Sequence, residues 1–195
     1  MRVLQNLTFE PIPSVVSHEN VFNSNELFYL RDLAINSKLN GKIGGNNELN
    51  QNPSIRSSKI TWLEFNDENE WIYNRLETLV SSMNEKFFRF KLTQFVDQIQ
   101  LSNYDCNVNG HYSWHIDMGG TNTPSRKLSL VLQLSDHESY EGGDLEIQTS
   151  NGIQKVPKKQ GFLVAFPSWT LHRVTPVTKG NRQSLVLWVA GPRFE

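Results

Sequence analysis

The stretch Trp114-His115-Ile116-Asp117-Met118 decides how the rest of the chain is interpreted. β-type residues flank it, which predicts a strand, and every second side chain of a strand points to the same face. His115 and Asp117 are therefore expected to share one metal ion, and His172 is the candidate third ligand from a remote strand. Two imidazoles and one carboxylate form the facial set typical of non-haem Fe(II), with positions left open for substrates.

Arg182 follows the second histidine by ten residues, in the run Asn181-Arg182-Gln183-Ser184. A guanidinium stays protonated and offers a planar fork to a carboxylate, so an arginine beside such a metal suits a dicarboxylate co-substrate. Ser184 lies two residues further along the same predicted strand face, where its hydroxyl is expected to contact the same carboxylate. Together these residues predict a metal site with a second, anionic ligand.

The length and composition limit which proteins can carry this site. The 195 residues suit one domain with a sizeable core, and a net charge of −1 with 20% charged residues gives no electrostatic footprint for nucleic acid. Cys106 is the sole cysteine, so it cannot form an internal disulfide, and the amino terminus lacks the apolar core of a secretion signal. No apolar run approaches the roughly 20 residues that span a bilayer. We therefore expect a cytoplasmic protein that binds neither nucleic acid nor membrane.

Two helices are predicted in the first half of the chain. The first spans about 23–38 and starts at Asn23, with Glu26 three residues later as in a capping box. The second starts at Asp67 by the same logic, with Glu70 three residues later. Its apolar side chains recur at helical spacing and are expected to pack in the core: Ile72, Leu76, Leu79, Val80, Met83 and Phe87.

Short β segments separated by turn signals such as Asn109-Gly110 and Asn151-Gly152 dominate the rest of the chain. Strands are predicted at 57–65, 88–92, 95–104, 112–117, 127–134, 144–149, 153–156, 162–166, 171–175 and 183–190. This pattern favours an α+β, mainly β fold: a double-stranded β-helix, or cupin-like jelly roll, with supporting N-terminal helices. We expect one domain over 1–195, with a helical support region at 1–92 and the jelly-roll core at 93–195. The segments 41–53 and 119–125 are expected to be loops.

Longer motifs surround the predicted ligands: Tyr104 and Tyr112 ahead of His115, Arg126-Lys127-Leu128-Ser129-Leu130, Tyr140-Glu141-Gly142-Gly143-Asp144-Leu145, Phe166-Pro167-Ser168, the run from His172 to Arg182, and Trp188. A bare His-x-Asp is a weak signal, but its combination with Glu-Gly-Gly-Asp and His-Arg-Val-x-Pro-Val-x-x-Gly-x-Arg is highly specific. With these motifs, the run from Tyr104 to Arg182 resembles the catalytic core of the 2-oxoglutarate/Fe(II)-dependent dioxygenases. The resemblance is to the prolyl 4-hydroxylase-like branch, which includes the bacterial and phage PKHD-type hydroxylases.

The resemblance implies that His115, Asp117 and His172 bind Fe(II) and that Arg182 binds the distal carboxylate of 2-oxoglutarate. O2 is then the second co-substrate, and ascorbate is the expected reductant. Three further side chains are expected to help bind 2-oxoglutarate: Tyr104 from the facing strand, Ser184, and Gln133, which stands where some prolyl hydroxylases carry a tyrosine. The candidate substrate-binding residues are Tyr112, at the entrance, and Trp188, near the iron.

The implied activity is hydroxylation of a substrate C–H bond, coupled to the release of succinate and CO2. Peptidyl proline is the leading substrate, in a protein or peptide received by the loops 41–53 and 119–125, while a free amino acid or another protein side chain stays open. The alternative from another class is a non-catalytic, metal-binding cupin-like module. An open three-ligand site beside Arg182 favours an enzyme, because structural metal sites are usually coordinatively closed. The sequence predicts no oligomeric state.

Overall fold

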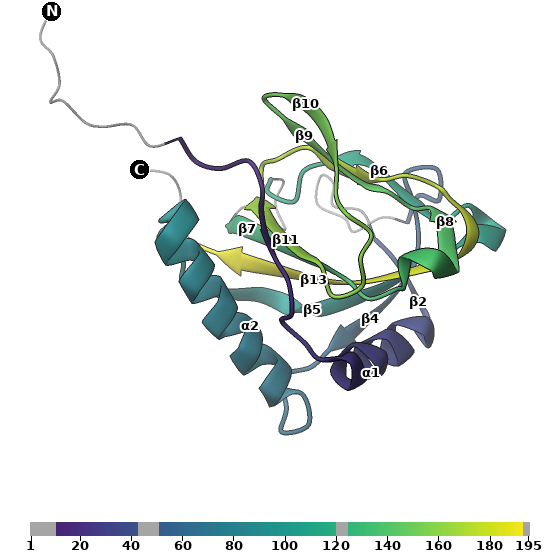
Figure 1. Ribbon diagram of the computed structural model, residues 1–195, viewed down its shortest axis with the longest axis horizontal. Helices are drawn as coiled ribbons and strands as arrows, with labels where there is room; N and C mark the ends of the chain where they lie inside the picture. The colour runs from purple at the N-terminus through teal and green to yellow at the C-terminus, as the bar shows by residue number, and fades with distance from the viewer. Residues whose placement is uncertain (1–10, 43–50, 120–124, 193–195) are drawn as a thin grey trace, which may run out of the picture.

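Two antiparallel sheets lie face to face in the computed structural model, which describes residues 11–42, 51–119 and 125–192 (Figure 1). The main sheet has the order β1 (Val16–His18), β11 (Leu163–Pro167), β7 (Arg126–Gln133), β13 (Val177–Ala190), β5 (Gln94–Asp105), β4 (Lys59–Leu63) and β2 (Leu39–Asn40), and β8 (Tyr140–Gly142) also pairs with β13. The smaller sheet has the order β10 (Gly152–Lys155), β9 (Leu145–Thr149), β12 (His172–Val174), β6 (His111–His115) and β3 (Arg56–Ser57). This arrangement confirms the predicted mainly β jelly roll.

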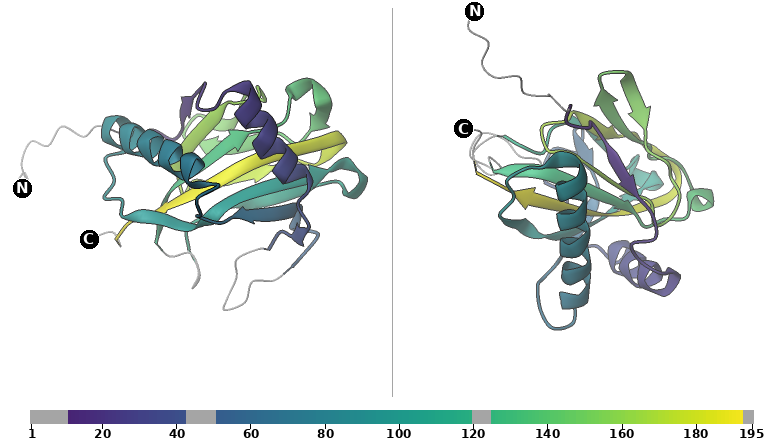
Figure 2. Two further views of the ribbon diagram at one scale, coloured as in Figure 1. Left: turned by 90° about the horizontal axis from the view of Figure 1, so that it is seen from below. Right: turned by 60° about the vertical axis from the view of Figure 1, so that its left-hand side comes forward.

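The helices α1 (Ser24–Ile35) and α2 (Glu70–Met83) cover the face of the main sheet that points away from the smaller sheet (Figure 2). The predicted capping box of α1 is present, because the Glu26 N–H donates to Asn23 Oδ1 at 3.0 Å and the Asn23 N–H donates to Glu26 Oε2 at 2.8 Å. The helix ends at Ile35 rather than at 38. The Asn36 N–H closes its last turn by donating to the backbone carbonyls of Ala34 and Asp32. None of the helices in the described ranges combines the length and apolarity needed to cross a membrane.

The second helix begins and ends differently from the prediction. Its N-cap is Asn69, not Asp67, and the preceding turn is closed by the Asn69 N–H, which donates to Asn66 Oδ1 at 3.0 Å. After Met83 the chain widens into a π-helical turn, Asn84–Phe88, so the predicted strand at 88–92 is absent. The wider turn leaves the Phe87 side chain 39% exposed. The other apolar side chains predicted for this helix are buried in the core or pack against it.

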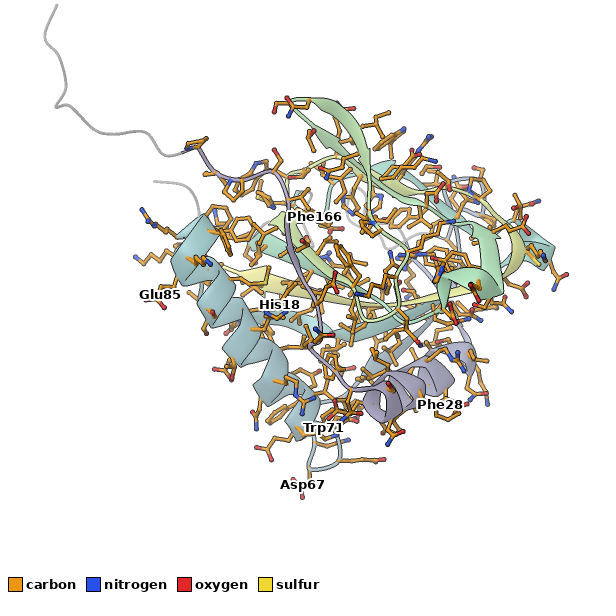
Figure 3. The ribbon with its side chains drawn as sticks, viewed as in Figure 1. His18, Phe28, Asp67, Trp71, Glu85 and Phe166 are labelled. Carbon is orange, nitrogen blue, oxygen red and sulfur yellow. The ribbon has the colours of Figure 1, made fainter. Side chains whose placement is uncertain are left out.

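Successive side chains along the central strands point alternately to two faces of the main sheet. One face packs against the helices (the helix face), and the other faces the smaller sheet (the site face). On β7, Leu128, Leu130 and Leu132 pack into the core under the helices, whereas Ser129 and Gln133 lie on the opposite face. Side chains fill both layers: Phe166 lies in the layer between the sheets, and Trp71 lies in the layer beneath the helices (Figure 3). The polar positions of the central strands therefore face the smaller sheet.

The N-terminal part of the chain supplies strands as well as helices. β1, β2 and β4 join the main sheet, and β3 joins the smaller one beside β6, so the predicted strand 57–65 is divided between the two sheets. The parts of the predicted loops at 43–50 and 120–124 lie outside the described residues. The division of the chain at residue 92 stays a prediction.

Candidate active site

Three side chains with metal-binding atoms meet between the two sheets: His115, Asp117 and His172. Their candidate ligand atoms all lie within 4.8 Å of one another. His115 Nε2 is 3.7 Å from Asp117 Oδ1, and His172 Nε2 is 3.5 Å from Asp117 Oδ2. His115 ends β6 and His172 begins β12, directly opposite in the sheet register. The structure therefore brings the three predicted ligands together.

The backbone places Asp117 in a way that the sequence did not predict. The strand ends at His115, so Asp117 is not on it, and the Asp117 N–H donates to the Ser168 carbonyl at 2.9 Å. The Asp117 Oδ2 atom also accepts a hydrogen bond from the Ser129 hydroxyl at 2.7 Å. A turn anchored on Ser168, rather than strand alternation, aims this carboxylate at the two histidines.

Hydrogen bonds to backbone carbonyls orient both imidazole rings. His115 Nδ1 lies 2.8 Å from the Ser113 carbonyl, and His172 Nδ1 lies 2.9 Å from the Thr170 carbonyl. A carbonyl oxygen only accepts, so each Nδ1 carries the hydrogen and each Nε2 presents its lone pair to the cluster. This is the arrangement of histidines that bind a metal through Nε2.

The charges of the cluster also suit a divalent cation. Burial, reinforced by the nearby His172, lowers the pKa of His115 to about 3. Burial acts to raise the pKa of Asp117, but the two histidines, together with side-chain hydrogen bonding such as that from Ser129, hold that pKa below its ordinary value. His115 is thus neutral and Asp117 ionised at neutral pH, which metal binding requires. The donor set fits a first-row ion such as Fe(II).

The Ser129 hydroxyl orients the metal-binding carboxylate and is itself 2.9 Å from the Ser168 hydroxyl. We expect Ser129→Ala to weaken metal binding by about 10- to 100-fold, because partners of metal ligands have effects of this size. Competition with a chromogenic chelator measures the affinity. Ser135→Ala is the control, since Ser135 is equally buried but bonds to Gln183. Equal losses of metal affinity in the two variants would show that a buried serine matters only for folding.

Acid is expected to destabilise the metal-free protein through His115. The unfolded chain takes up a proton below the ordinary pKa of 6.5, whereas folded His115 resists protonation down to about 3. Stability is therefore lost as pH falls from 6.5 towards 3, by up to about 1.4 kcal/mol per pH unit. Urea unfolding between pH 6.5 and 4.5 measures the slope, and His115→Gln is expected to flatten it. An unchanged slope in that variant would refute the prediction.

A row of side chains on the site face of the main sheet leads away from the metal-binding cluster. Across β13 and β7, Trp188 lies opposite Ser129, and Ser184 lies opposite Gln133. Across β13 and β5, Arg182 lies directly opposite Tyr104, with the guanidinium 5.4 Å from the ring centre. A narrow cavity runs along this row, and its walls include the three candidate ligands, Tyr104, Arg182 and Ser184. The predicted metal site and the predicted carboxylate site are thus two ends of one cavity.

Among the described residues, several buried polar groups at or near the Arg182 end of this cavity have no protein partner. Arg182 is 1% exposed, and its only hydrogen bond is from Nη1 to Ser184 Oγ at 3.4 Å, leaving Nε and Nη2 unpaired among the described residues. Both polar atoms of the Gln133 side chain and the Tyr140 hydroxyl are also buried and unpaired. An unmet buried donor costs about 1–3 kcal/mol. A carboxylate, which only accepts, fits this end.

The entrance is formed by a stack of three side chains. Tyr112 stacks on His115, with ring centres 3.5 Å apart and planes at 15°, and the Arg56 guanidinium covers the Tyr112 ring at 4.7 Å. A second cavity of about 330 Å³ opens beside it, lined by Trp62, Tyr112, Asp117, Arg126 and Trp188 among others. The predicted substrate-binding residues Tyr112 and Trp188 therefore stand between the metal cluster and this second cavity.

Sequence reasoning assigned no role to Arg56, Ser129 or Tyr140. Arg56 reaches the entrance only because β3 pairs with β6, and no local pattern predicts that pairing. Ser129 and Tyr140 belong to motifs that the resemblance had identified, and their position in those motifs was the available signal. Their contacts with Asp117 and Arg182 depend on the folded sheets.

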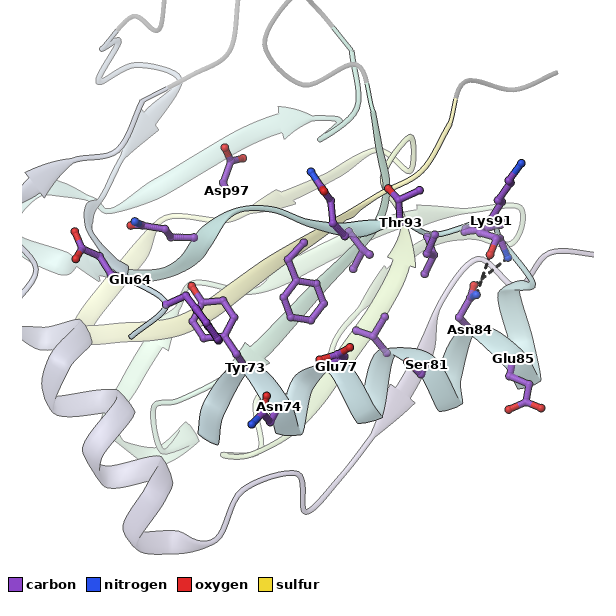
Figure 4. Close-up of a pocket in the computed structure, with 18 residues that line it drawn as sticks. Glu64, Tyr73, Asn74, Glu77, Ser81, Asn84, Glu85, Lys91, Thr93 and Asp97 are labelled. Atoms are coloured by element: carbon purple, nitrogen blue, oxygen red, sulfur yellow. Dashed lines mark hydrogen bonds between the residues drawn. The ribbon is translucent and has the colours of Figure 1, made fainter. Parts of the chain in front are cut away.

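A larger hollow, of about 1050 Å³, lies elsewhere. It is an open groove between α2 and the start of β5, with Glu64, Glu77 and Glu85 along it (Figure 4). None of the three candidate ligands lines it. Its size therefore does not make it the active site, which the ligand atoms place between the sheets.

Comparison with known proteins places this site in a known class. Two histidines and one carboxylate with open positions are the ligand set typical of non-haem Fe(II) oxygenases. Residues 99–190 match the model of the 2OG-Fe(II) oxygenase superfamily. This match spans just under half of the chain, and the curated relatives that the chain resembles are PKHD-type hydroxylases.

Two of these relatives illustrate the extent of the match. The PKHD-type hydroxylase of Teredinibacter turnerae is 35% identical over 133 residues, which cover 65% of this chain and 58% of the relative. That of Alteromonas mediterranea is 43% identical over 84 residues, which cover 40% of this chain and 37% of the relative. Each match thus covers less than two thirds of the relative's own length.

Two solved structures share the fold. A Trichoplax adhaerens prolyl hydroxylase, in complex with a hypoxia inducible factor oxygen degradation domain peptide fragment, gives a TM-score of 0.76 at 18% identity, covering 91% of this chain and 83% of that one. A Pseudomonas putida prolyl-4-hydroxylase gives a TM-score of 0.71 at 19% identity, covering 92% and 93%. At these identities the likeness establishes the fold.

Proposed function

We propose that this protein is a 2-oxoglutarate- and Fe(II)-dependent dioxygenase that hydroxylates a substrate C–H bond. The observation that carries the proposal is Arg182: a buried guanidinium without a carboxylate partner among the described residues, in the same cavity as the three-ligand cluster. A buried charge is stable only when it is paired. A co-substrate that binds the metal at one end and presents a carboxylate at the other supplies that pair.

The chain's own residues bind the metal and the co-substrate, orient them, and shield them from water. His115, Asp117 and His172 hold the metal from one side and leave the other side open. Fe(II) held by these residues would supply the oxidising chemistry with O2 and 2-oxoglutarate, with succinate and CO2 as co-products and ascorbate as reductant. Four side chains hold the distal carboxylate of 2-oxoglutarate: Arg182, Tyr104, Ser184 and Gln133. The two sheets exclude water from this end, which strengthens the charge pairing.

Peptidyl proline is the proposed substrate. The solved structures that share the fold include a prolyl hydroxylase in complex with a peptide fragment. The second cavity adjoins Asp117 and offers the aromatic side chains Trp62, Tyr112 and Trp188, against which an apolar pyrrolidine ring packs well. The substrate is then a protein or peptide met in the cytoplasm, where Cys106 stays a free thiol.

A specific observation favours a second candidate, the hydroxylation of a free amino acid. The second cavity is also lined by Lys42, Arg56 and Arg126, and Asp97 pairs with Arg126. This leaves positive charge beside the metal site, which suits the carboxylate of a small substrate. Peptide and free proline therefore belong in the same assay.

The test is succinate formation from 2-oxoglutarate under air with added Fe(II), with and without each candidate substrate. Formation that requires His115, shown by loss in His115→Ala, and that rises with a proline-containing peptide supports both parts of the proposal. A rise with free proline alone supports the second candidate. Tight metal binding without 2-oxoglutarate turnover under any condition would favour the non-catalytic metal-binding module and contradict the proposal.

A further inference from the structure

A tyrosine that the proposed function does not use lies near Arg182, outside the residues that line the cavity. Tyr140 is 3% exposed, and its hydroxyl has no hydrogen-bond partner among the described residues. Burial raises the pKa of Tyr140, and the nearby Arg182 offsets only part of that rise, although the two groups do not meet hydrogen-bond geometry. Tyr140 therefore stays protonated at neutral pH, and its oxygen is free to accept a hydrogen bond.

Two glycines allow Tyr140 and Arg182 to lie close together. β8 pairs with the start of β13, so that Tyr140 lies opposite Gly180, which has a φ of 66°. A Cβ on Gly180 would lie 2.2 Å from the Ser139 carbonyl oxygen, so only glycine allows this close approach. A Cβ on Gly143 would lie 3.1 Å from Arg182 Cδ and 3.3 Å from Tyr140 Cε2. The two side chains converge on the space that Gly143 leaves open.

A count of donors and acceptors shows what Tyr140 can do there. A guanidinium has five N–H groups, and Ser184 Oγ takes one of those of Arg182. A carboxylate bound by the planar fork takes two more. Two N–H groups then remain in a buried place, and the structure offers two buried, unpaired acceptors, Tyr140 Oη and Gln133 Oε1. Gln133 is in register with Ser184 on the neighbouring strand, on the side of Arg182 that faces β7.

We propose that Tyr140 is a positioning residue for Arg182. Its oxygen accepts a hydrogen bond from the guanidinium and thereby fixes the fork that receives the distal carboxylate, while Gln133 Oε1 does the same from β7. This inference rests on the proposed function and deepens it, because it makes the Arg182 end of the cavity selective for 2-oxo acids with a second carboxylate.

Calorimetric titration of the Mn(II)-loaded protein measures co-substrate binding without turnover. Tyr140→Phe removes only the hydroxyl, and we expect it to weaken 2-oxoglutarate binding about 10-fold, which is about 1.4 kcal/mol. Binding of 2-oxobutyrate, which has no distal carboxylate, is expected to stay unchanged. Gln133→Leu is the second variant, and the same selective loss is expected.

The matched control is Tyr29→Phe, which removes a hydroxyl 3.4 Å from Glu68 on the helix side of the molecule. It should bind both ligands as the parent chain does. If the parent binds 2-oxoglutarate and Tyr140→Phe binds it equally well, the positioning role is wrong while the proposed function stands. Equal weakening of both ligands would also overturn it, because a merely structural role does not distinguish them. A parent chain that binds no 2-oxoglutarate would overturn the proposed function as well.

Discussion

Asp117→Ala is expected to abolish the rise in thermal unfolding temperature that Fe(II) or Mn(II) causes in the parent protein. A ligand that binds only the folded state stabilises it by an amount that rises with the logarithm of the ligand concentration divided by Kd, so the shift reports metal binding. Changes to partners of metal ligands cost about 10- to 100-fold, so removal of the central ligand should cost more than about 100-fold. Turnover of 2-oxoglutarate should fall below detection in the same variant.

The control is a second histidine–aspartate pair on the surface. Asp136 Oδ1 lies 3.2 Å from His137 Nδ1, but both side chains are at least half exposed, and within the described ranges no third ligand joins them. Asp136→Ala should therefore keep the full metal-induced shift. A shift that survives in Asp117→Ala would mean that the ion binds elsewhere and that the assigned cluster is not the metal centre.

The two histidines of this cluster were predictable from the sequence, and the exact placement of the aspartate was not. His115 and His172 end and begin strands that alternation and turn signals had located within a few residues. Asp117 owes its position to the Ser168 carbonyl, which is remote in the sequence and near only after folding. The motif predicted that Asp117 would lie beside the two histidines, as it does, although strand alternation was the wrong physical reason.

Other differences between the predicted and the observed structure also arise from contacts between segments that are remote in the sequence. The apolar run around Phe88 suits a strand locally, but the π-helical turn after α2 buries that ring in the helix layer instead. Arg56 stacks on Tyr112 because two strands far apart in the chain pair with each other. Tyr140 reaches Arg182 because Gly180 lets β8 approach β13. Local patterns predict elements, whereas these contacts arise from pairing between elements.

Arg182→Met is expected to produce two effects of opposite sign. It should weaken 2-oxoglutarate binding by about 100-fold or more, because a bidentate, charge-assisted pair is lost from a buried place. It should also stabilise the ligand-free protein by about 1–3 kcal/mol, because a buried charge with unpaired Nε and Nη2 is replaced by an apolar side chain of similar length. Calorimetry on the Mn(II)-loaded protein measures the first effect, and urea unfolding measures the second.

Arg173→Met separates these effects from the general loss of an arginine. Arg173 donates from Nε to Glu146 Oε2 at 2.7 Å and lies over the Trp114 ring at 4.7 Å, so its charge is already paired in the folded protein. Its replacement should lower stability and leave 2-oxoglutarate affinity unchanged, the reverse of the result at Arg182. If Arg182→Met instead destabilised the ligand-free protein, the positive charge of the guanidinium would already be compensated within the folded protein. Its unpaired state would then no longer be evidence for a bound carboxylate.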